Sequence, residues 1–193
     1  MALRRTEELH GKSRGLDMQP PLAVLATLAE AQIEAAIAVK EALPALADAS
    51  ELAARQLSSG GRLVYAAAGS SGLMALADGL ELPGTFGIPR ERIVILVAGG
   101  AASLRDLAGG PEDDEELARA DIASAGVDGR DCVIAVSASG STPYALAALA
   151  AARAAGARTI AFANNARAPL FDAADVAVSL PTLPADAKPL GEA

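Results

Sequence analysis

Two short stretches of small, hydroxyl-bearing residues are the positions in this chain best suited to binding chemistry. GSSG at residues 69–72 follows the apolar run RLVYAAA, and SASGST at residues 137–142 follows the apolar run DCVIAV. Glycine lets backbone N–H groups approach an anion closely, and serine and threonine add side-chain donors. We therefore predict a phosphate site formed by both stretches. Its predicted residues are Gly69, Ser70, Ser71, Gly72, Ser137, Ser139, Gly140, Ser141 and Thr142.

The same hydroxyl groups have a simpler interpretation as helix caps. Ser137, Ser139 and Thr142 stand just before an alanine-rich run, and Ser and Thr are preferred at helix N-termini. Two such stretches, each with more hydroxyls than a cap requires, favour the binding interpretation. SASGST lacks the lysine of GxxxxGK[ST] and the spacing of GxGxxG, which disfavours a nucleoside triphosphatase or a dinucleotide site. A small phosphorylated molecule remains as the expected ligand.

Two glutamates are the candidates for acid-base catalysis. Glu81 is a lone carboxylate in the apolar context LELP, a setting that suits a carboxyl group to donate a proton. Glu112 opens the acidic run EDDEE, where the preference of acidic residues for a first helical turn is the competing explanation. The one histidine, His10, excludes a histidine-cluster metal site, and the one cysteine, Cys132, is expected to be a buried small hydrophobe. No metal or cofactor is expected.

The elements that must position these residues follow from hydrophobic periodicity. Helical spacing predicts two helices over residues 22–57, broken near Pro44 and Asp48. The predicted strands are residues 62–67, the β-branched run of RIVILVAGG that is bounded by charge and glycine, residues 132–136, residues 158–163 and DVAVSL. The predicted helices between them are residues 73–81, 112–124, 143–155 and a short one near 170–174. Strands that are apolar on both faces and alternate with helices are typical of a parallel sheet covered on both sides.

The fold class is therefore predicted to be α/β, a three-layer αβα sandwich with a mostly parallel five-stranded sheet and an N-terminal helical arm. Residues 1–58 are expected to form the arm and helices that pack on the core or on a partner subunit, and residues 59–193 the binding core. The net charge of -8 disfavours nucleic acid and anionic membrane surfaces as partners. Neither a spanning run of ~20 apolar residues nor a signal peptide is recognised, so a cytoplasmic protein is expected.

Five motifs, taken in order, resemble those of the sugar isomerase (SIS) domain family. They are RLVYAAAGSSG, DGLELPGTFGI, LVAGG, GGPEDD and VIAVSASGSTPYALAAL. Within that family the sequence is similar to the N-acetylmuramic acid 6-phosphate etherases, from about Thr6 to about Pro181. It departs from their pattern at Leu73 and Ser141, where the etherases have arginine, and in the C-terminal LPTLPADAKPLGEA, which lacks a segment that they carry.

The resemblance implies a phosphorylated amino sugar as substrate and cleavage of its lactyl ether, without a metal, to N-acetylglucosamine 6-phosphate and D-lactate. It implies that Glu81 protonates the departing lactate and that Glu112 is the base. It also implies a homodimer with sites near the subunit interface. Two other functions stay open at this stage: a phosphosugar isomerase, and a regulator that senses a sugar phosphate without chemistry.

Overall fold

The computed structural model describes residue 6, residues 11–106 and residues 110–182, and its centre is a five-stranded parallel sheet. The strand order is β2-β1-β3-β4-β5, and every neighbouring pair is parallel. The strands are β1 Leu63–Ala67, β2 Ile93–Val97, β3 Cys132–Val136, β4 Arg158–Ala163 and β5 Val176–Ser179. All five predicted strands are confirmed, with ends within one residue.

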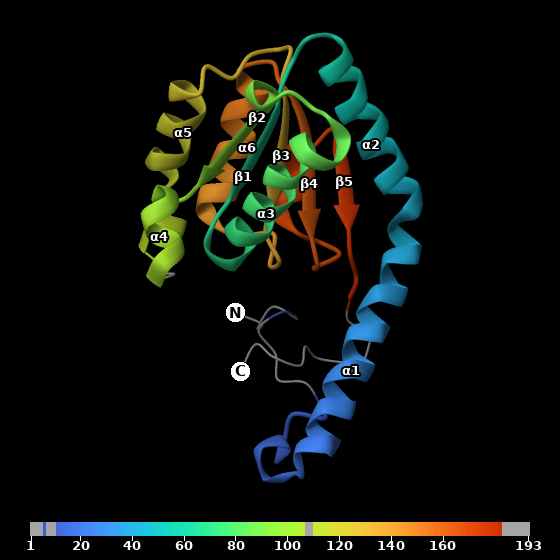
Figure 1. Cartoon of the computed structure of the whole chain (residues 1–193). Coiled ribbons are helices and arrows are strands. Elements are labelled where there is room, and N and C mark those ends of the chain that lie inside the picture. Colours follow the sequence, from blue (N-terminus) through green and yellow to red (C-terminus); the bar gives the residue numbers. More distant parts are fainter. Residues whose placement is uncertain (1–5, 7–10, 107–109, 183–193) are drawn as a thin grey trace.

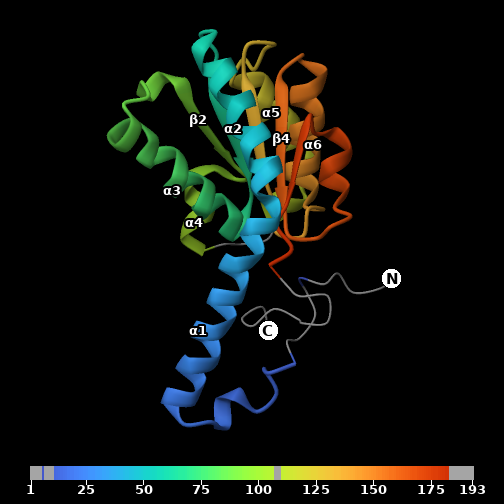
Figure 2. The same cartoon turned by 90° about the vertical axis from the view of Figure 1, so that its right-hand side faces the viewer.

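Helices cover both faces of this sheet, which confirms the predicted three-layer sandwich (Figure 1). The helices α2 (Leu43–Ser58) and α3 (Gly69–Phe86) lie on the front face, and α5 (Glu115–Ser124) and α6 (Pro143–Ala154) lie behind it. Figure 2 shows α3 and α6 on opposite sides of the sheet. The helix α4 (Gly100–Asp106) follows β2 and was not predicted. The short 3-10 turns are η2 Leu16–Met18, η3 Val39–Ala42, η4 Arg90–Arg92, η5 Gly110–Asp113 and η6 Pro169–Ala173.

The core is divided by the sheet into two layers. Alternate residues of β1 serve each layer, because successive strand side chains point to opposite faces. Val64 and Ala66 pack in the rear layer with α5 and α6, whereas Leu63, Tyr65 and Ala67 pack in the front layer with α2 and α3. Small alanine side chains let the rear helices approach the sheet closely, so this aromatic-poor chain still builds a dense core.

The N-terminal arm is the helix α1 (Pro21–Ala38), which extends past the sheet and has no buried residue (Figures 1 and 2). The predicted break near Pro44 and Asp48 was misplaced. The interruption is η3, and Pro44 lies in the first turn of α2, where its missing N–H costs no helical hydrogen bond. Among the described residues, one helical stretch, Pro21–Ser58, is long and apolar enough to cross a membrane by length and composition alone.

Three predicted boundaries near the candidate site are corrected. GSSG is the first turn of α3 rather than a loop, because Gly69, at φ +53°, turns the chain directly from β1 into the helix. The helix α3 also continues past Glu81 to Phe86, where Gly87 in the left-handed region ends it. Glu112 lies in η5 rather than in α5, because Asp114 caps α5 by accepting a 2.9 Å hydrogen bond from the N–H of Leu117.

Candidate functional site

The two hydroxyl-bearing stretches start at the ends of neighbouring strands. Ala67, the last residue of β1, is paired in register with Val136, the last residue of β3. The carboxyl ends of parallel strands meet at one edge of a sheet, which is where ligands bind in open α/β folds. Ser70, Ser71 and Ser137 consequently line the same cavity, which has a volume of about 640 Å³. A volume of this size fits a small sugar phosphate.

The cavity has hydroxyl and amide groups at the carboxyl edge of the sheet, its polar end, and a wall that is apolar apart from the Tyr65 hydroxyl and the Asp78 carboxylate. Its polar end is formed by Ser70, Ser71, Ser137 and Asn164. The wall continues from α3 across the front of the sheet to the residue after β5. The remaining lining residues are Tyr65, Met74, Ala75, Asp78, Ile134, Val136, Ala138, Phe162, Ala163 and Leu180. A ligand with one charged group and a less polar body matches this division.

The first turn of α3 supplies the positive potential at the polar end. Its N-cap residue, Ala68, has no side chain that could accept a hydrogen bond from the turn. The N–H groups of Gly69, Ser70 and Ser71 have no acceptor within the helix, and they carry the positive end of its dipole. Gly72 has a packing role, because an added Cβ would lie 2.8 Å from Cγ1 of Val97.

The loop between β3 and α6 is held by hydrogen bonds among its own residues. Ser137 Oγ lies 2.9 Å from Thr142 Oγ1 and accepts from the N–H of Gly140 at 3.1 Å. Ser139 Oγ accepts from the hydroxyl of Ser141 at 3.0 Å and from its N–H at 3.3 Å. Ser137 is 3% exposed and Ser141 is 8% exposed. Only Ser137 of this group lines the cavity, and Thr142 is the N-cap of α6 without a side-chain capping bond.

A third strand end supports this loop. Asn165, after β4, donates from Nδ2 to the carbonyl of Ser139 at 2.9 Å and to Thr6 Oγ1 at 3.4 Å. Gly140 has φ +68°, and an added Cβ would lie 2.2 Å from Cβ of Ala168. From the sequence, NNARAP is predicted only as a connecting turn. The signal that this prediction overlooked was two amide side chains directly after a third predicted strand.

A tyrosine-carboxylate pair lines the cavity on the side of α3 and was also overlooked. Tyr65 donates from its hydroxyl to Asp78 Oδ2 at 2.5 Å, joining β1 to α3. Burial of Tyr65, followed by its hydrogen bond to Asp78, raises the pKa of its hydroxyl above the usual range. Tyr65 is therefore a permanent hydrogen-bond donor at neutral pH.

The two candidate catalytic glutamates lie at different positions along α3. Glu112 Oε2 is 3.6 Å from the position of a Cβ on Gly69, at the start of the helix. Glu81 is exposed about two thirds of the way along the helix, twelve residues after Gly69, which corresponds to about 18 Å along the helix axis. Neither glutamate is among the residues that line the cavity. A single copy of the chain does not bring Glu81 and Glu112 together.

Cys132 is the small buried hydrophobe that its sequence context predicted. It is fully buried, and burial, with smaller contributions from Asp175 and Asp131, raises the pKa of its thiol to about 12. Within residues 11–106 and 110–182 together with residue 6, no group of three or more His, Cys, Asp or Glu residues is arranged to hold a metal ion. His10 lies outside the described residues.

Solved structures share this fold. A phosphoheptose isomerase from Francisella tularensis aligns with a TM-score of 0.68 at 20% identity, covering 84% of this chain and 86% of that one. The phosphoheptose isomerase GmhA from Neisseria gonorrhoeae aligns with a TM-score of 0.63 at 18% identity, covering 82% and 84%. At these identities the likeness establishes the common fold alone.

Sequence relatives are more similar. A Deinococcus radiodurans protein named N-acetylmuramic acid 6-phosphate etherase is 46% identical over 181 residues, which are 94% of this chain and 59% of the relative. A Cronobacter sakazakii protein of the same name is 41% identical over 164 residues, 85% of this chain and 55% of the relative. The chain thus spans less than two thirds of the length of these relatives. A family model, described as the glucokinase regulatory protein N-terminal SIS domain, matches residues 45–153. Since that match covers more than half of its residues, the chain belongs to the SIS-domain family, as its motifs predicted.

Proposed function

We propose that the protein is a phosphosugar-binding lyase that cleaves the lactyl ether of N-acetylmuramic acid 6-phosphate, giving N-acetylglucosamine 6-phosphate and D-lactate. The observation that carries this proposal is the 46% identity over 181 residues to a relative named for that substrate and reaction. The cavity at the carboxyl edge of the sheet supports the same substrate class, because hydroxyl groups and a helix N-terminus converge on its polar end.

The phosphate is assigned to this polar end. Ser70, Ser71 and Ser137 donate from their hydroxyls, and the N–H groups of the first turn of α3 neutralise the dianion. Gly69 gives the backbone close approach, and Gly72 lets α3 pack on β2. The other predicted residues, Ser139, Gly140, Ser141 and Thr142, hold the loop that presents Ser137.

The proposed reaction is an elimination followed by addition of water. The sugar opens to its aldehyde, a base removes the C2 proton, and the C3–O bond breaks as lactate leaves with a proton from a general acid. Water then adds across the new C2–C3 double bond. Glu112, near the start of α3, is assigned as the base, and Glu81 is assigned as the acid. Neither step requires a metal.

The assembly and the location complete this proposal. We assign the protein to the cytoplasm as a homodimer, with residues 59–193 as the phosphosugar-binding core and residues 1–58 as the arm. About 18 Å along the axis of α3 separates Glu81 from Gly69, beside which Glu112 lies, and a homodimer would let two copies contribute to one site.

The direct test is release of D-lactate from N-acetylmuramic acid 6-phosphate. Glu81→Gln and Glu112→Gln are each expected to lower turnover by roughly 10²- to 10⁴-fold, the usual loss for an acid-base group. Glu91→Gln, which changes an exposed glutamate in η4, is the matched control and should keep wild-type turnover. Absence of D-lactate with micromolar wild-type enzyme would rule out the lyase.

A non-catalytic phosphosugar sensor is the second candidate, favoured by the position of Glu81 outside the cavity lining. A sensor would bind glucosamine 6-phosphate and gain thermal stability without converting any phosphosugar. Thermal unfolding with and without the ligand, alongside the D-lactate assay, separates this function from the lyase.

A further inference from the structure

Asp78 is a carboxylate in the cavity lining to which the proposed reaction assigns no part. It lies in the middle of α3, beside Tyr65 of β1, and both residues line the cavity. Asp78 Oδ2 accepts the Tyr65 hydroxyl at 2.5 Å, whereas within the described part of the chain no donor bonds to Oδ1. A carboxylate has about four acceptor sites, so most of the accepting capacity of Asp78 is available to a ligand.

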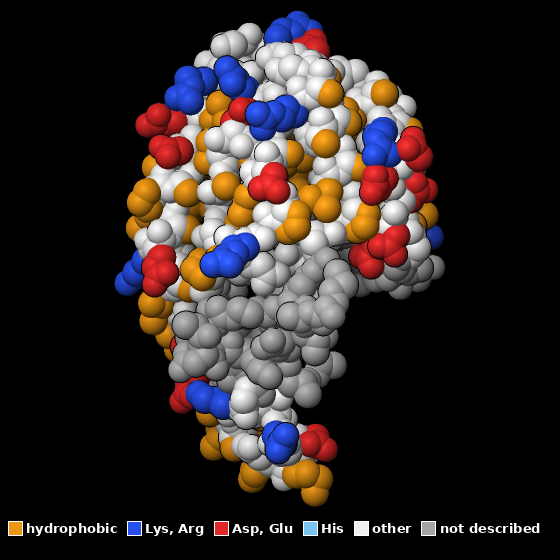
Figure 3. Space-filling view, turned by 180° about the vertical axis from the view of Figure 1, so that it is seen from behind, with side chains coloured by type: hydrophobic (Ala, Val, Ile, Leu, Met, Phe, Trp, Pro, Cys, Tyr) orange, Lys and Arg blue, Asp and Glu red, His pale blue; other side chains and the backbone are white. Residues whose placement is uncertain are grey.

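The charge of Asp78 also has no partner of opposite sign in the cavity. None of the described lining residues is Lys or Arg, and Asp78 takes part in none of the ion pairs among the described residues. Figure 3 shows a contrasting surface on the opposite side of the molecule, where Lys and Arg side chains lie among those of Asp and Glu. A carboxylate that faces a cavity without a countercharge attracts hydrogen-bond donors and repels anions.

The position of Asp78 on α3 sets its distance from the polar end of the cavity. Asp78 comes seven residues after Ser71, which is two helical turns along the same face and about 10 Å along the axis. Helix side chains tilt toward the N-terminus, which brings the carboxylate closer to that end. A hexose 6-phosphate extends over a comparable distance, so a ligand with its phosphate at Ser71 presents its far end to Asp78.

We propose that Asp78 determines specificity for the sugar part of the ligand. Its carboxylate accepts hydrogen bonds from sugar hydroxyl groups at the end far from the phosphate, and it excludes ligands that carry a second anionic group there. Tyr65 is a positioning residue, because its hydroxyl fixes the carboxylate through Oδ2. This inference rests on the proposed binding of a phosphosugar in the cavity, and it does not depend on the lyase reaction.

The competing explanation is that the hydrogen bond between Tyr65 and Asp78 only joins α3 to β1. However, α3 already packs closely on the sheet through its other face. Ala75 is 3% exposed, and a Cβ added to Gly79 would lie 2.9 Å from Cδ1 of Ile95. A purely structural bond would affect unfolding without affecting the choice between ligands. Ligand preference is therefore the property to measure.

The experiment compares glucose 6-phosphate with glucose 1,6-bisphosphate by isothermal titration calorimetry on the full chain. Whichever phosphate of the bisphosphate occupies the polar end, the other one lies near Asp78. The wild type is expected to bind the monophosphate at least about tenfold more tightly, because like charges repel. A wild type that binds both ligands equally, or neither of them, would overturn the proposal.

Asp78→Asn should change the two affinities in opposite directions. Binding of glucose 6-phosphate is expected to weaken about tenfold, because a neutral amide is a weaker acceptor than a carboxylate. Binding of the bisphosphate is expected to strengthen about tenfold, because the repulsion is gone. Asp48→Asn, which changes an exposed carboxylate on α2 outside the cavity lining, is the matched control and should change neither affinity. If Asp78→Asn shifts both affinities equally or not at all, Asp78 does not select the ligand.

Tyr65→Phe separates the position of the carboxylate from its charge. This variant keeps the negative charge and loses one hydrogen bond, so glucose 6-phosphate should bind about threefold more weakly and the bisphosphate should still be disfavoured. Relief of the bisphosphate exclusion in Tyr65→Phe, to the extent seen in Asp78→Asn, would contradict the positioning role.

The outcomes distinguish this inference from the lyase proposal, because binding requires no turnover. The expected ligand preferences without D-lactate release would support the role of Asp78 and rule out the lyase. Release of D-lactate, with ligand preferences unchanged in Asp78→Asn, would overturn the role of Asp78 and leave the lyase in place.

Discussion

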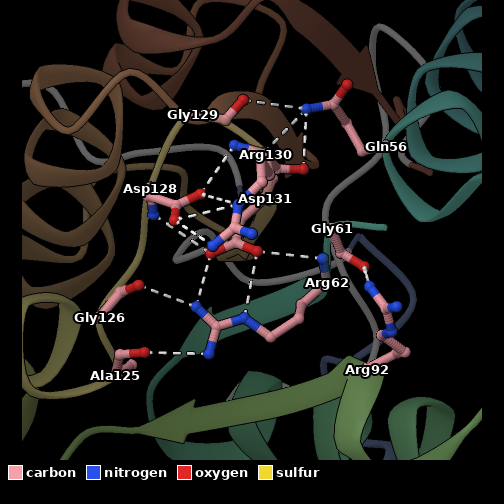
Figure 4. A network of polar contacts seen from close by, with 10 residues as sticks. All are labelled: Gln56, Gly61, Arg62, Arg92, Ala125, Gly126, Asp128, Gly129, Arg130 and Asp131. Carbon is pink, nitrogen blue, oxygen red and sulfur yellow. Dashed lines mark hydrogen bonds and ion pairs between the residues drawn. The ribbon is translucent and has the colours of Figure 1, made fainter. Parts of the chain in front are cut away.

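The two edges of the sheet are built in opposite ways. At the amino edge, where the strands begin, charged groups and backbone groups satisfy one another in a closed network (Figure 4). At the carboxyl edge, hydroxyl groups bond mainly to one another, and the first turn of α3 keeps unpaired N–H groups beside an open cavity. Hydrogen bonds that are complete within the chain stabilise a fold, whereas donors without a permanent acceptor are available to a ligand.

Arg62 and Asp131 are the centre of the amino edge. Arg62 donates from Nη2 to Asp131 Oδ2 at 2.6 Å and from Nε to Oδ1 at 3.1 Å, and its remaining donors reach the carbonyls of Ala125 and Gly126. Asp131 is 2% exposed and also accepts from the N–H of Arg62 and of Asp128. The hydrogen bond to Asp131 raises the pKa of the Arg62 guanidinium. This pair fixes the starts of β1 and β3.

Cavity volume does not show which edge of the sheet binds a ligand. The amino edge has a larger hollow, about 1070 Å³, between α2 and β5. Its charges are mutually paired: Arg55 lies 3.3 Å from Glu51, and Arg158 lies 3.8 Å from Asp175. The available donors, not the size, identify the carboxyl edge as the binding edge.

The largest expected effect comes from removing Asp131 from the hydrogen-bond network at the amino edge of the sheet. Asp131→Ala leaves the Arg62 guanidinium without its carboxylate and should lower the free energy of unfolding by about 3 kcal/mol. Urea denaturation measures this loss. Asp128→Ala, which removes an exposed partner of Arg130, is the control with a much smaller effect. Equal losses of unfolding free energy for both variants would mean that Asp131 stabilises the amino edge no more than the exposed Asp128 does.

A substitution at Gly140, at the carboxyl edge, should lower the free energy of unfolding by about 2 kcal/mol or more. Gly140→Ala places a methyl group against Ala168 and Ala163 in a backbone conformation that L residues rarely adopt. Gly100→Ala is a matched control, because Gly100 has the same φ of +68° and nothing within 4 Å of an added Cβ. The difference between the two variants in urea denaturation isolates the steric contact. No difference would indicate that the loop relaxes without cost.

Removing hydroxyls from the carboxyl edge should weaken binding more than it weakens folding. Ser137→Ala with Ser139→Ala is expected to cost about 1 kcal/mol of stability, because the lost bonds are neutral and within one loop. The same double variant should abolish thermal stabilisation by glucosamine 6-phosphate. Ser50→Ala, which removes an exposed hydroxyl on α2, should retain that stabilisation. If the double variant also keeps it, the phosphate binds elsewhere.

The smallest expected effect is on how the free energy of unfolding changes at alkaline pH. Cys132 opens β3 at the amino edge, and its folded pKa is about 12, against about 8.5 for an unfolded thiol. The folded state therefore retains a proton that the unfolded state loses, so stability falls as pH rises above about 8.5. The expected fall is about 1 kcal/mol between pH 8 and pH 9.5, and Cys132→Ala should flatten it. A wild-type curve flat over this range would show that the thiol is not shielded.

Much of the architecture was predictable from local patterns. Apolar runs such as RLVYAA and DCVIAV are short, β-branched or small, and bounded by polar residues, so β1 and β3 were located within one residue. The start of α3 was misjudged because GSSG has the composition of a loop. A single φ of +53° at Gly69 placed it in the helix instead.

Contacts between segments that are distant in the sequence could not be predicted from such local patterns. Tyr65 and Asp78 are separated in sequence, and only the packing of α3 on β1 joins them. Asn165 supports the Ser139 loop because β4 lies beside β3. No periodicity encodes these neighbours, since they follow from the order of strands in the sheet.

The sequence by itself determined the family, the strands and the two hydroxyl-bearing stretches, because these depend on residue types at short spacing. The tertiary structure decided which hydroxyls reach the cavity and which only hold the loop. It also decided that Glu112 lies beside the start of α3 whereas Glu81 lies about 18 Å farther along it, since a helix separates residues in proportion to their spacing. Distance between side chains is a property of the folded chain, and it is what turns candidate residues into a site or keeps them apart.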